Sequence, residues 1–187
     1  IYRVGPLARL NASEGMATPL AQEEYKRMYE TLGGKPVHNT LAFHWARLIE
    51  LLYATERCLE LSRDPEITSK DVRNPPSEPG EGVGIVEAAR GTLIHHYQLD
   101  QEGLVKKLNL IVATTNNAPA ICMSIRDAAK GLIKGGNVNE GLLNMVEMAF
   151  RAYDPCFACA THFAVGQMPL EVKVYDHNKH LLKVIKR

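Results

Sequence analysis

Residues 39–62 read NTLAFHWARLIELLYATERCLELS, and this stretch carries the clearest helical pattern of the chain. Asn39 is suited to cap the first turn, and Asp64-Pro65 follows the last one. Apolar or small side chains recur at every third or fourth position, which places them on one face of an α-helix. These positions are Leu41, Trp45, Leu48, Leu52, Thr55 and Leu59. The pattern predicts a long central helix over 39–62.

Shorter helical patterns lie on both sides of this stretch. Residues 20–33 carry apolar side chains at roughly helical spacing and stop at Gly33-Gly34, a pair that ends helices. Residues 119–133 and 138–153 show the same spacing and are separated by a second glycine pair. The proline- and glycine-rich residues 72–82 are typical of a loop. The chain is therefore expected to be mainly helical.

Two stretches have the composition of β-structure. Residues 83–115 hold three runs rich in β-branched and aromatic side chains, with a turn at Asp100-Gln101-Glu102-Gly103. Residues 171–186 hold two apolar runs around Asp176-His177-Asn178. We predict a small antiparallel sheet at about 83–115 and a C-terminal β-hairpin. The expected fold class is α+β, mainly α.

Bulk composition excludes several classes of protein. The chain has 187 residues, enough for one domain with a substantial core. Its formal net charge of +1 gives no support to nucleic-acid binding. No apolar run is long enough to span a membrane, so a soluble protein is expected, and no signal sequence opens the chain. The stretch after Ile1 resembles mid-protein sequence, and we expect a fragment.

The four cysteines fall into two groups. Cys58 and Cys122 lie within helical patterns and are expected to be small buried side chains. Cys156 and Cys159 lie three apart within 154–162, which reads DPCFACATH and adds a carboxylate before the pair and an imidazole after it. A C-x-x-C pair alone is compatible with a thioredoxin-like dithiol, half of a zinc site, or part of another metal site.

Further segments of the chain favour one of these alternatives. Residues 154–162 resemble the C-terminal nickel-binding signature in the large subunit of nickel–iron hydrogenases. Segments 4–9 (VGPLAR), 87–91 (EAARG) and 111–115 (IVATT) resemble other segments of that family. The resemblance covers essentially the whole chain. It implies the C-terminal part of the large, catalytic subunit, from the cytoplasmic cofactor-linked branch and in unprocessed precursor form.

The resemblance implies a metal centre with defined ligands. In this family four cysteine thiolates hold nickel, and two of them bridge to an iron that carries one carbon monoxide and two cyanides. Cys156 matches the terminal nickel ligand of the C-terminal pair, and Cys159 matches the bridging ligand. His162 and the backbone carbonyl of Leu110 match ligands of a magnesium-type ion. Soft thiolates suit nickel.

Other residues match the surroundings of that centre. Arg90 matches the arginine over the metals and Asp154 one of the carboxylates that hold it, so both are expected to act in catalysis with Cys156. Arg90 alone could equally be a surface charge after a strand. The remaining matches are Thr114 as a donor to one cyanide, Leu93 and Val112 as apolar lining, and Ala89 where many members have proline.

The implied reaction is the reversible heterolytic cleavage of H2 to protons and electrons. An iron–sulfur small subunit would take up the electrons. The family's other C-x-x-C pair is absent from this chain, so the fragment alone is expected to be inactive and free of nickel and iron. The alternatives are a zinc-binding module, a complex-I-like subunit, and the large subunit of a membrane-bound or formate-linked hydrogenase.

The tail after residue 162 suggests a precursor. The family is commonly made with a C-terminal extension that an endopeptidase removes after nickel insertion. The expected cut lies between His162 and Phe163. Residues 1–162 would then be the hydrogenase portion and 163–187 the extension, with nickel-insertion and endopeptidase maturation factors as partners.

Overall fold

The computed structural model describes residues 1–161 and 171–186. Within these ranges the chain forms seven α-helices, one 3-10 helix and five strands, which confirms the predicted mainly helical α+β class. In chain order they are α1 Pro6–Ala12, α2 Pro19–Thr31, α3 Ala42–Leu61, η1 Pro65–Thr68, β1 Glu81–Ala88, β2 Gly91–Leu99, β3 Val105–Ile111, α4 Ala113–Asn116, α5 Ala118–Leu132, α6 Glu140–Arg151, α7 Phe157–Thr161, β4 Glu171–Tyr175 and β5 Leu181–Lys186.

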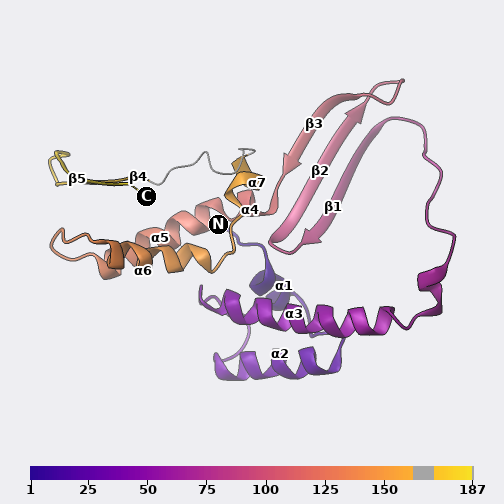
Figure 1. Cartoon of the computed structure of the whole chain (residues 1–187), viewed down its shortest axis with the longest axis horizontal. Helices are drawn as coiled ribbons and strands as arrows, with labels where there is room; N and C mark the ends of the chain where they lie inside the picture. The colour runs from indigo at the N-terminus through magenta and orange to yellow at the C-terminus, as the bar shows by residue number, and fades with distance from the viewer. Residues whose placement is uncertain (162–170, 187) are drawn as a thin grey trace.

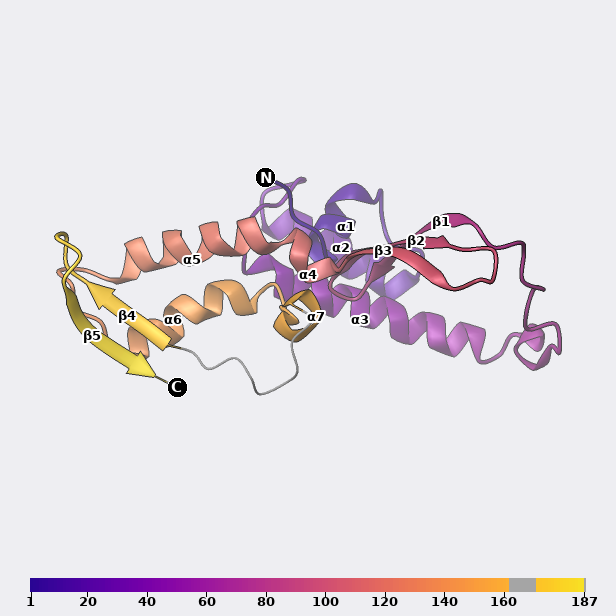
Figure 2. The same ribbon diagram turned by 90° about the horizontal axis from the view of Figure 1, so that it is seen from above.

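The molecule is elongated, with three parts that meet near its middle (Figure 1). Helices α1, α2 and α3 pack together as one part, and the sheet β1–β3 projects from them on one side. The antiparallel pair α5 and α6 extends on the opposite side, with the hairpin β4–β5 at its far end (Figure 2). Helices α4 and α7 lie at the junction between these parts.

The sheet is antiparallel in the order β1-β2-β3, as predicted. Strands β1 and β2 pair as far as Ala88 and Gly91, which leaves Ala89 and Arg90 as the tight turn between them. Strand β3 ends at Ile111. The composition of residues 112–115 favours a longer strand, but α4 begins at Ala113, because Ala113 and Thr114 are buried at the junction. Tertiary burial here overrides β-propensity.

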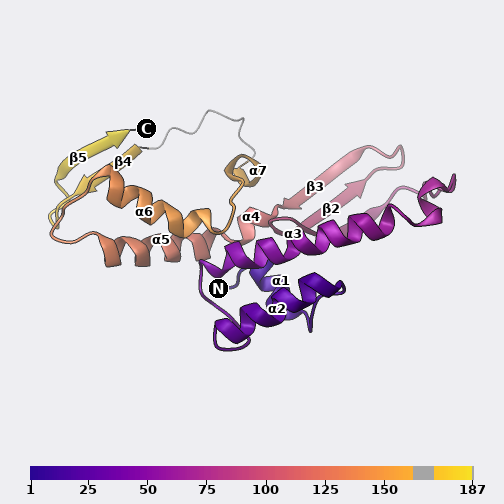
Figure 3. The same cartoon turned by 60° about the horizontal axis from the view of Figure 1, so that its bottom comes forward.

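Helix α3 runs from the centre of the molecule toward the end that carries the sheet (Figure 3), but its buried face differs from the predicted one. Its fully buried side chains are Ala42, Phe43, Ala46 and Ile49. The predicted stripe is largely exposed, with Leu41, Leu48 and Leu59 each more than half exposed. Small alanines allow α1 and α2 to approach the other face closely, so the larger leucines lie outside that contact.

Two local predictions were also wrong. Asn39 does not cap α3 directly, since the helix begins at Ala42 and the Asn39 side chain accepts the N–H of Leu41 in the preceding turn. Cys58 and Cys122 are exposed, not buried, because they lie on helix faces turned away from the core.

In the described part of the chain, no helix has both the length and the apolar character needed to cross a membrane.

One side-chain contact fixes the end of α6 against α3. The rings of Phe43 and Tyr153 lie 4.9 Å apart between centroids, and Tyr153 is 2% exposed. The Tyr153 hydroxyl hydrogen-bonds to Ser124 of α5 at 3.0 Å. Arg47 of α3 donates to the carbonyl of Ala152 at 3.0 Å. The core therefore fixes the backbone just before Asp154.

Glu56 of α3 caps the N-terminus of α2. Its carboxylate accepts the Thr18 hydroxyl at 2.6 Å and the N–H groups of Leu20 and Ala21 at 3.1 and 3.0 Å. These N–H groups belong to the first turn, where no intrahelical acceptor is available. The hydrogen bond from Thr18 lowers the pKa of Glu56 most; desolvation opposes the shift, and the two backbone donors add to it.

This cap predicts a pH-dependent stability. The folded pKa of Glu56 lies below its unfolded value of about 4.3, so the cap stabilises the fold above that pH and is lost as pH falls through the folded pKa. Urea midpoints should therefore be lower for Glu56→Gln than for wild type near pH 7 and should converge as the pH falls through the folded pKa of Glu56. Glu30→Gln, on the exposed face of α2, is the control. A constant difference at all pH values would contradict the assignment.

Candidate functional site

A pocket of about 150 Å³ lies where the sheet meets α4 and α7. It brings together side chains from the β1–β2 turn, the start of β2, the β3–α4 junction and the C-terminal motif. The lining residues are Ala88, Ala89, Arg90, Leu93, Val112, Ala113, Thr114, Cys156 and Cys159. Seven site residues predicted from the sequence thus share one pocket, although up to 70 positions separate them. Their individual roles stay predictions.

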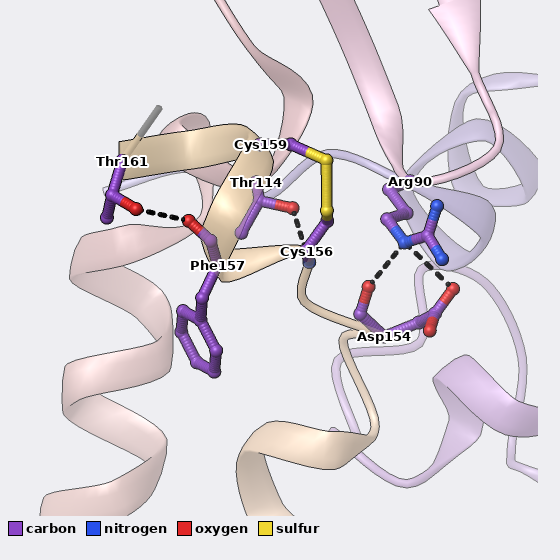
Figure 4. Close-up of a disulfide and its surroundings, with 7 residues drawn as sticks. All are labelled: Arg90, Thr114, Asp154, Cys156, Phe157, Cys159 and Thr161. Atoms are coloured by element: carbon purple, nitrogen blue, oxygen red, sulfur yellow. Dashed lines mark hydrogen bonds and ion pairs between the residues drawn. A yellow bond between two sulfur atoms is a disulfide. The ribbon is translucent and has the colours of Figure 1, made fainter. Parts of the chain in front are cut away.

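Cys156 and Cys159 form one wall of this pocket at the start of α7. In this structure they are joined as a disulfide, with their Cα atoms 5.3 Å apart (Figure 4). A disulfide sulfur is not a thiolate ligand, so metal binding requires the reduced pair. When reduced, the pair offers two soft thiolates, which suit nickel. Within residues 1–161 and 171–186, no group of three or more His, Cys, Asp or Glu side chains is placed to hold a metal ion.

Thr114 links α4 to the cysteine pair. Its side chain is 5% exposed, and its hydroxyl oxygen accepts the N–H of Cys156 at 3.2 Å (Figure 4). The bond fixes the start of the C-x-x-C segment against the end of the sheet. Because a hydroxyl both donates and accepts, this bond leaves the Thr114 proton able to point toward a ligand in the pocket.

Arg90 and Asp154 form a pair at the rim of the pocket (Figure 4). The Nε of Arg90 donates to the Asp154 carbonyl at 2.9 Å and lies 3.2 Å from its Oδ2. Both side chains are nearly half exposed, so the pair adds little to stability and chiefly orients the guanidinium. Asp154 has φ of +51°, an uncommon conformation for a non-glycine residue and one seen at functional sites.

The backbone on either side of Arg90 is held by residues 4 and 5. Gly91 has φ of +132°, and a Cβ placed on it would lie 2.3 Å from Cγ2 of Val4. A Cβ on Gly5 would lie 3.2 Å from the carbonyl oxygen of Arg90. The N-terminal segment and the β1–β2 turn are therefore in direct backbone contact, which only glycine allows at position 91.

Asn117 completes this contact and was not singled out in the sequence. Its side chain is 2% exposed, and its amide accepts from the Val4 N–H at 2.9 Å and donates to the Val4 carbonyl at 3.1 Å. Little in the sequence indicates this role of Asn117, because its position directly before Ala118-Pro119 shows only where a helix starts. Such a position suggests a helix cap, whereas here the side chain pairs with a residue 113 positions away.

Arg9 was also missed as a residue of the site. Its guanidinium contacts Glu50 of α3, Glu87 of β1 and the carbonyls of Ala88 and Ala89. Burial lowers the pKa of Arg9. The hydrogen bonds that Arg9 donates to Glu50 and then to Glu87, with the negative charge of these carboxylates, raise the pKa by more than burial lowers it. In the sequence Arg9 is the last residue of the VGPLAR segment, but this position does not indicate which residues Arg9 contacts.

Besides Asp154 at the rim, one predicted site residue in the described part of the chain, Leu110, is not part of the pocket lining. Leu110 lies on β3 opposite His95, and the role of its carbonyl stays a prediction. His162 and Phe163 lie outside the residues that the structure describes. The ion site and the cleavage site are thus predictions as well.

Comparison with known proteins identifies the family to which this fold and its sequence motifs belong. The family model described as nickel-dependent hydrogenase matches residues 1–162. This chain belongs to the nickel-dependent hydrogenase family, an oxidoreductase family.

Individual relatives agree with the family. The chain is 53% identical to an iron-sulfur subunit of the F420-non-reducing hydrogenase of Archaeoglobus profundus, over 100% of this chain and 38% of the relative. It is 47% identical to the NAD-reducing hydrogenase HoxS subunit beta of Cupriavidus necator, over 93% and 36%. The crystal structure of an NAD+-reducing [NiFe]-hydrogenase in the H2-reduced state superposes with a TM-score of 0.82 at 41% identity, covering 87% of this chain and 36% of that one. The chain thus spans little more than a third of these proteins.

The contact between Val4 and Gly91 gives a direct test of the pocket's framework. Gly91→Ala should lower the free energy of unfolding by about 2–5 kcal/mol, because it adds both left-handed strain and a clash with Val4. Chemical denaturation of the full-length subunit measures this change. Gly84→Ala is the matched control, since a Cβ there meets no atom within 4 Å. Equal stability of the two variants would show that Val4 does not pack on the turn.

Proposed function

We propose that this chain is the C-terminal part of the large, catalytic subunit of a nickel–iron hydrogenase, which reversibly cleaves H2 to protons and electrons. The single observation that carries the proposal is the shared pocket, where Arg90, Thr114 and the cysteine pair meet from distant segments. Family membership supports nickel as the metal. The name of the NAD-reducing relative supports the cofactor-linked branch of the family, and we propose a cytoplasmic location with it.

The proposal assigns a role to each side chain of the pocket. Reduced Cys156 and Cys159 would hold nickel, with Cys159 also shared with iron. The nickel–iron centre with its carbon monoxide and cyanides would supply the site at which H2 is split. Thr114 would donate to a cyanide, and Leu93 and Val112 would exclude water from the apolar side. Ala89 has a small side chain, so the pocket would be wider at this position than it would be with a larger residue.

Arg90 would act next to the reacting atoms. Its Nε is held by Asp154, and a guanidinium in the lining of the pocket can stabilise developing negative charge there. The proton released from H2 would pass to the Cys156 thiolate or to Arg90. Because this chain supplies two of four thiolates, we propose that it is inactive by itself and holds no nickel–iron centre.

The partners follow from the same proposal. An iron–sulfur small subunit would take up the electrons, and nickel-insertion and endopeptidase factors would mature the large subunit. His162 and the Leu110 carbonyl would hold a magnesium-type ion. Residues 1–162 would be the mature portion and 163–187 the removable extension.

One observation favours a second candidate, a dithiol or zinc-binding module. The disulfide between Cys156 and Cys159 is the oxidised form that such a dithiol would adopt. This candidate predicts tight stoichiometric zinc binding by the reduced chain alone, with no need for other segments of the subunit.

Substitutions in the full-length subunit with its partner test the first candidate. Arg90→Lys should keep nickel but lower kcat for H2 oxidation by about 10²-fold, because one ammonium cannot reproduce the guanidinium geometry. Cys156→Ser should lose nickel, measured by elemental analysis. Arg63→Lys and Cys58→Ser, both at exposed positions, are the matched controls. Unchanged nickel in Cys156→Ser would reject the proposed ligand.

Maturation gives an independent test. The intact mass of the full-length subunit should fall by the mass of residues 163–187 only in cells grown with nickel. Phe163→Pro should block this loss and the activity together. Retention of the tail with and without nickel would instead favour the dithiol or zinc module.

A further inference from the structure

Arg9 makes an unusually complete set of hydrogen bonds. Its Nε and Nη2 donate to the two carboxylate oxygens of Glu50 at 2.7 and 2.6 Å. Its Nη1 donates to Glu87 at 3.0 Å and to the Ala88 carbonyl at 2.8 Å, and its Nη2 donates to the Ala89 carbonyl at 3.2 Å. A guanidinium has five N–H donors, and all five are used.

These bonds converge on the main chain just before Arg90. Ala88 ends β1 and Ala89 opens the turn, so these two carbonyls belong to the two residues directly before Arg90. Neither alanine has a side chain long enough to anchor the turn. The turn is instead held through Arg9, which forms a bidentate ion pair with Glu50 on the long helix α3.

The far side of Arg90 is fixed by the same N-terminal segment. Gly91 packs against Val4, and Gly5 lies under the Arg90 carbonyl. Arg9 lies on α1, which begins at Pro6 directly after these residues. One short segment, residues 4–9, therefore holds the backbone before and after Arg90, while Asp154 holds only its side chain.

The position of this guanidinium matters more than its presence. The Arg90 side chain is 43% exposed, and among the described residues its only anchor is Asp154, which holds its Nε, so the side chain follows the turn. A displacement of about 1 Å from a reacting centre can cost about 10²-fold in rate.

We propose that Arg9 is a positioning residue for Arg90: it clamps the Ala88 and Ala89 carbonyls to Glu50 and so fixes the Arg90 guanidinium beside the cysteine pocket. The inference rests on the proposed function of Arg90, but the clamp itself is a property of this chain's own residues. Lysine at position 9 would keep the charge toward Glu50, yet one ammonium with three donors cannot span two carbonyls and a carboxylate fork.

The test uses Arg9→Lys in the full-length subunit with its partner, with Arg63→Lys as the matched control. Hydrogen exchange should speed up by about tenfold in the peptide 87–93, for the loss of roughly one charge-assisted hydrogen bond, and should stay unchanged in α5 and α6. Nickel content should stay at the wild-type level. The kcat for H2 oxidation should fall at least tenfold with KM within twofold.

The outcomes separate the clamp from the proposed function. Wild-type exchange in peptide 87–93 of Arg9→Lys would overturn the clamp, whatever the activity. Faster exchange with unchanged kcat, while Arg90→Lys loses activity, would show that the clamp does not position Arg90 and would also overturn the inference. Faster exchange with an unaffected Arg90→Lys variant would reject the role of Arg90 and, with it, the positioning role of Arg9.

A second variant covers the case in which Arg9→Lys does not fold. Glu50→Gln keeps the Arg9 side chain and a neutral acceptor of the same shape, but removes the charge that anchors the clamp. It should show the same local increase in exchange at 87–93, smaller than tenfold, and a smaller loss of kcat. No local change in Glu50→Gln would count against the clamp.

Discussion

The contact between residues 4–9 and the β1–β2 turn holds together parts of the chain that are distant in sequence. Gly91 has no space for a side chain because Val4 occupies it, and Asn117 fixes Val4 by bonding both its N–H and its carbonyl. Arg9 adds a second set of bonds to the same turn from α1. The sheet, α1 and the α4–α5 junction are thereby joined at one point, and the pocket lies beside that point.

This arrangement explains how a half-exposed arginine can have a defined position. The Arg90–Asp154 pair is worth little energy in solvent, so it could not hold the turn alone. The buried contacts around Val4 and the bidentate Arg9–Glu50 pair supply the rigidity, and the Asp154 backbone is in turn fixed by Tyr153 in the core. A site that depends on a packed support is better defined than one that depends on surface charges.

The molecule is elongated, and Leu48 and Leu59 of α3 are more than half exposed. The chain spans little more than a third of the relatives to which it is similar. A second pocket of about 530 Å³ has Arg9, Glu50 and Asp154 in its lining. Ala88 and Ala89 line both pockets, so the backbone just before Arg90 contributes to both.

The sequence by itself determined the four longer helices, the small sheet, the tail hairpin and the residue types of the site, because these depend on local periodicity and on motifs of fixed spacing. The short helices α1, α4 and α7 were not predicted from it. It identified Arg90, Thr114 and the cysteine pair as members of one site through resemblance, whereas Arg9 and Asn117 escaped it. Only the tertiary structure decided which face of α3 is buried, where β3 ends and what holds the Arg90 turn. Those features depend on contacts between residues about 40 to 113 positions apart, and no local pattern encodes such contacts.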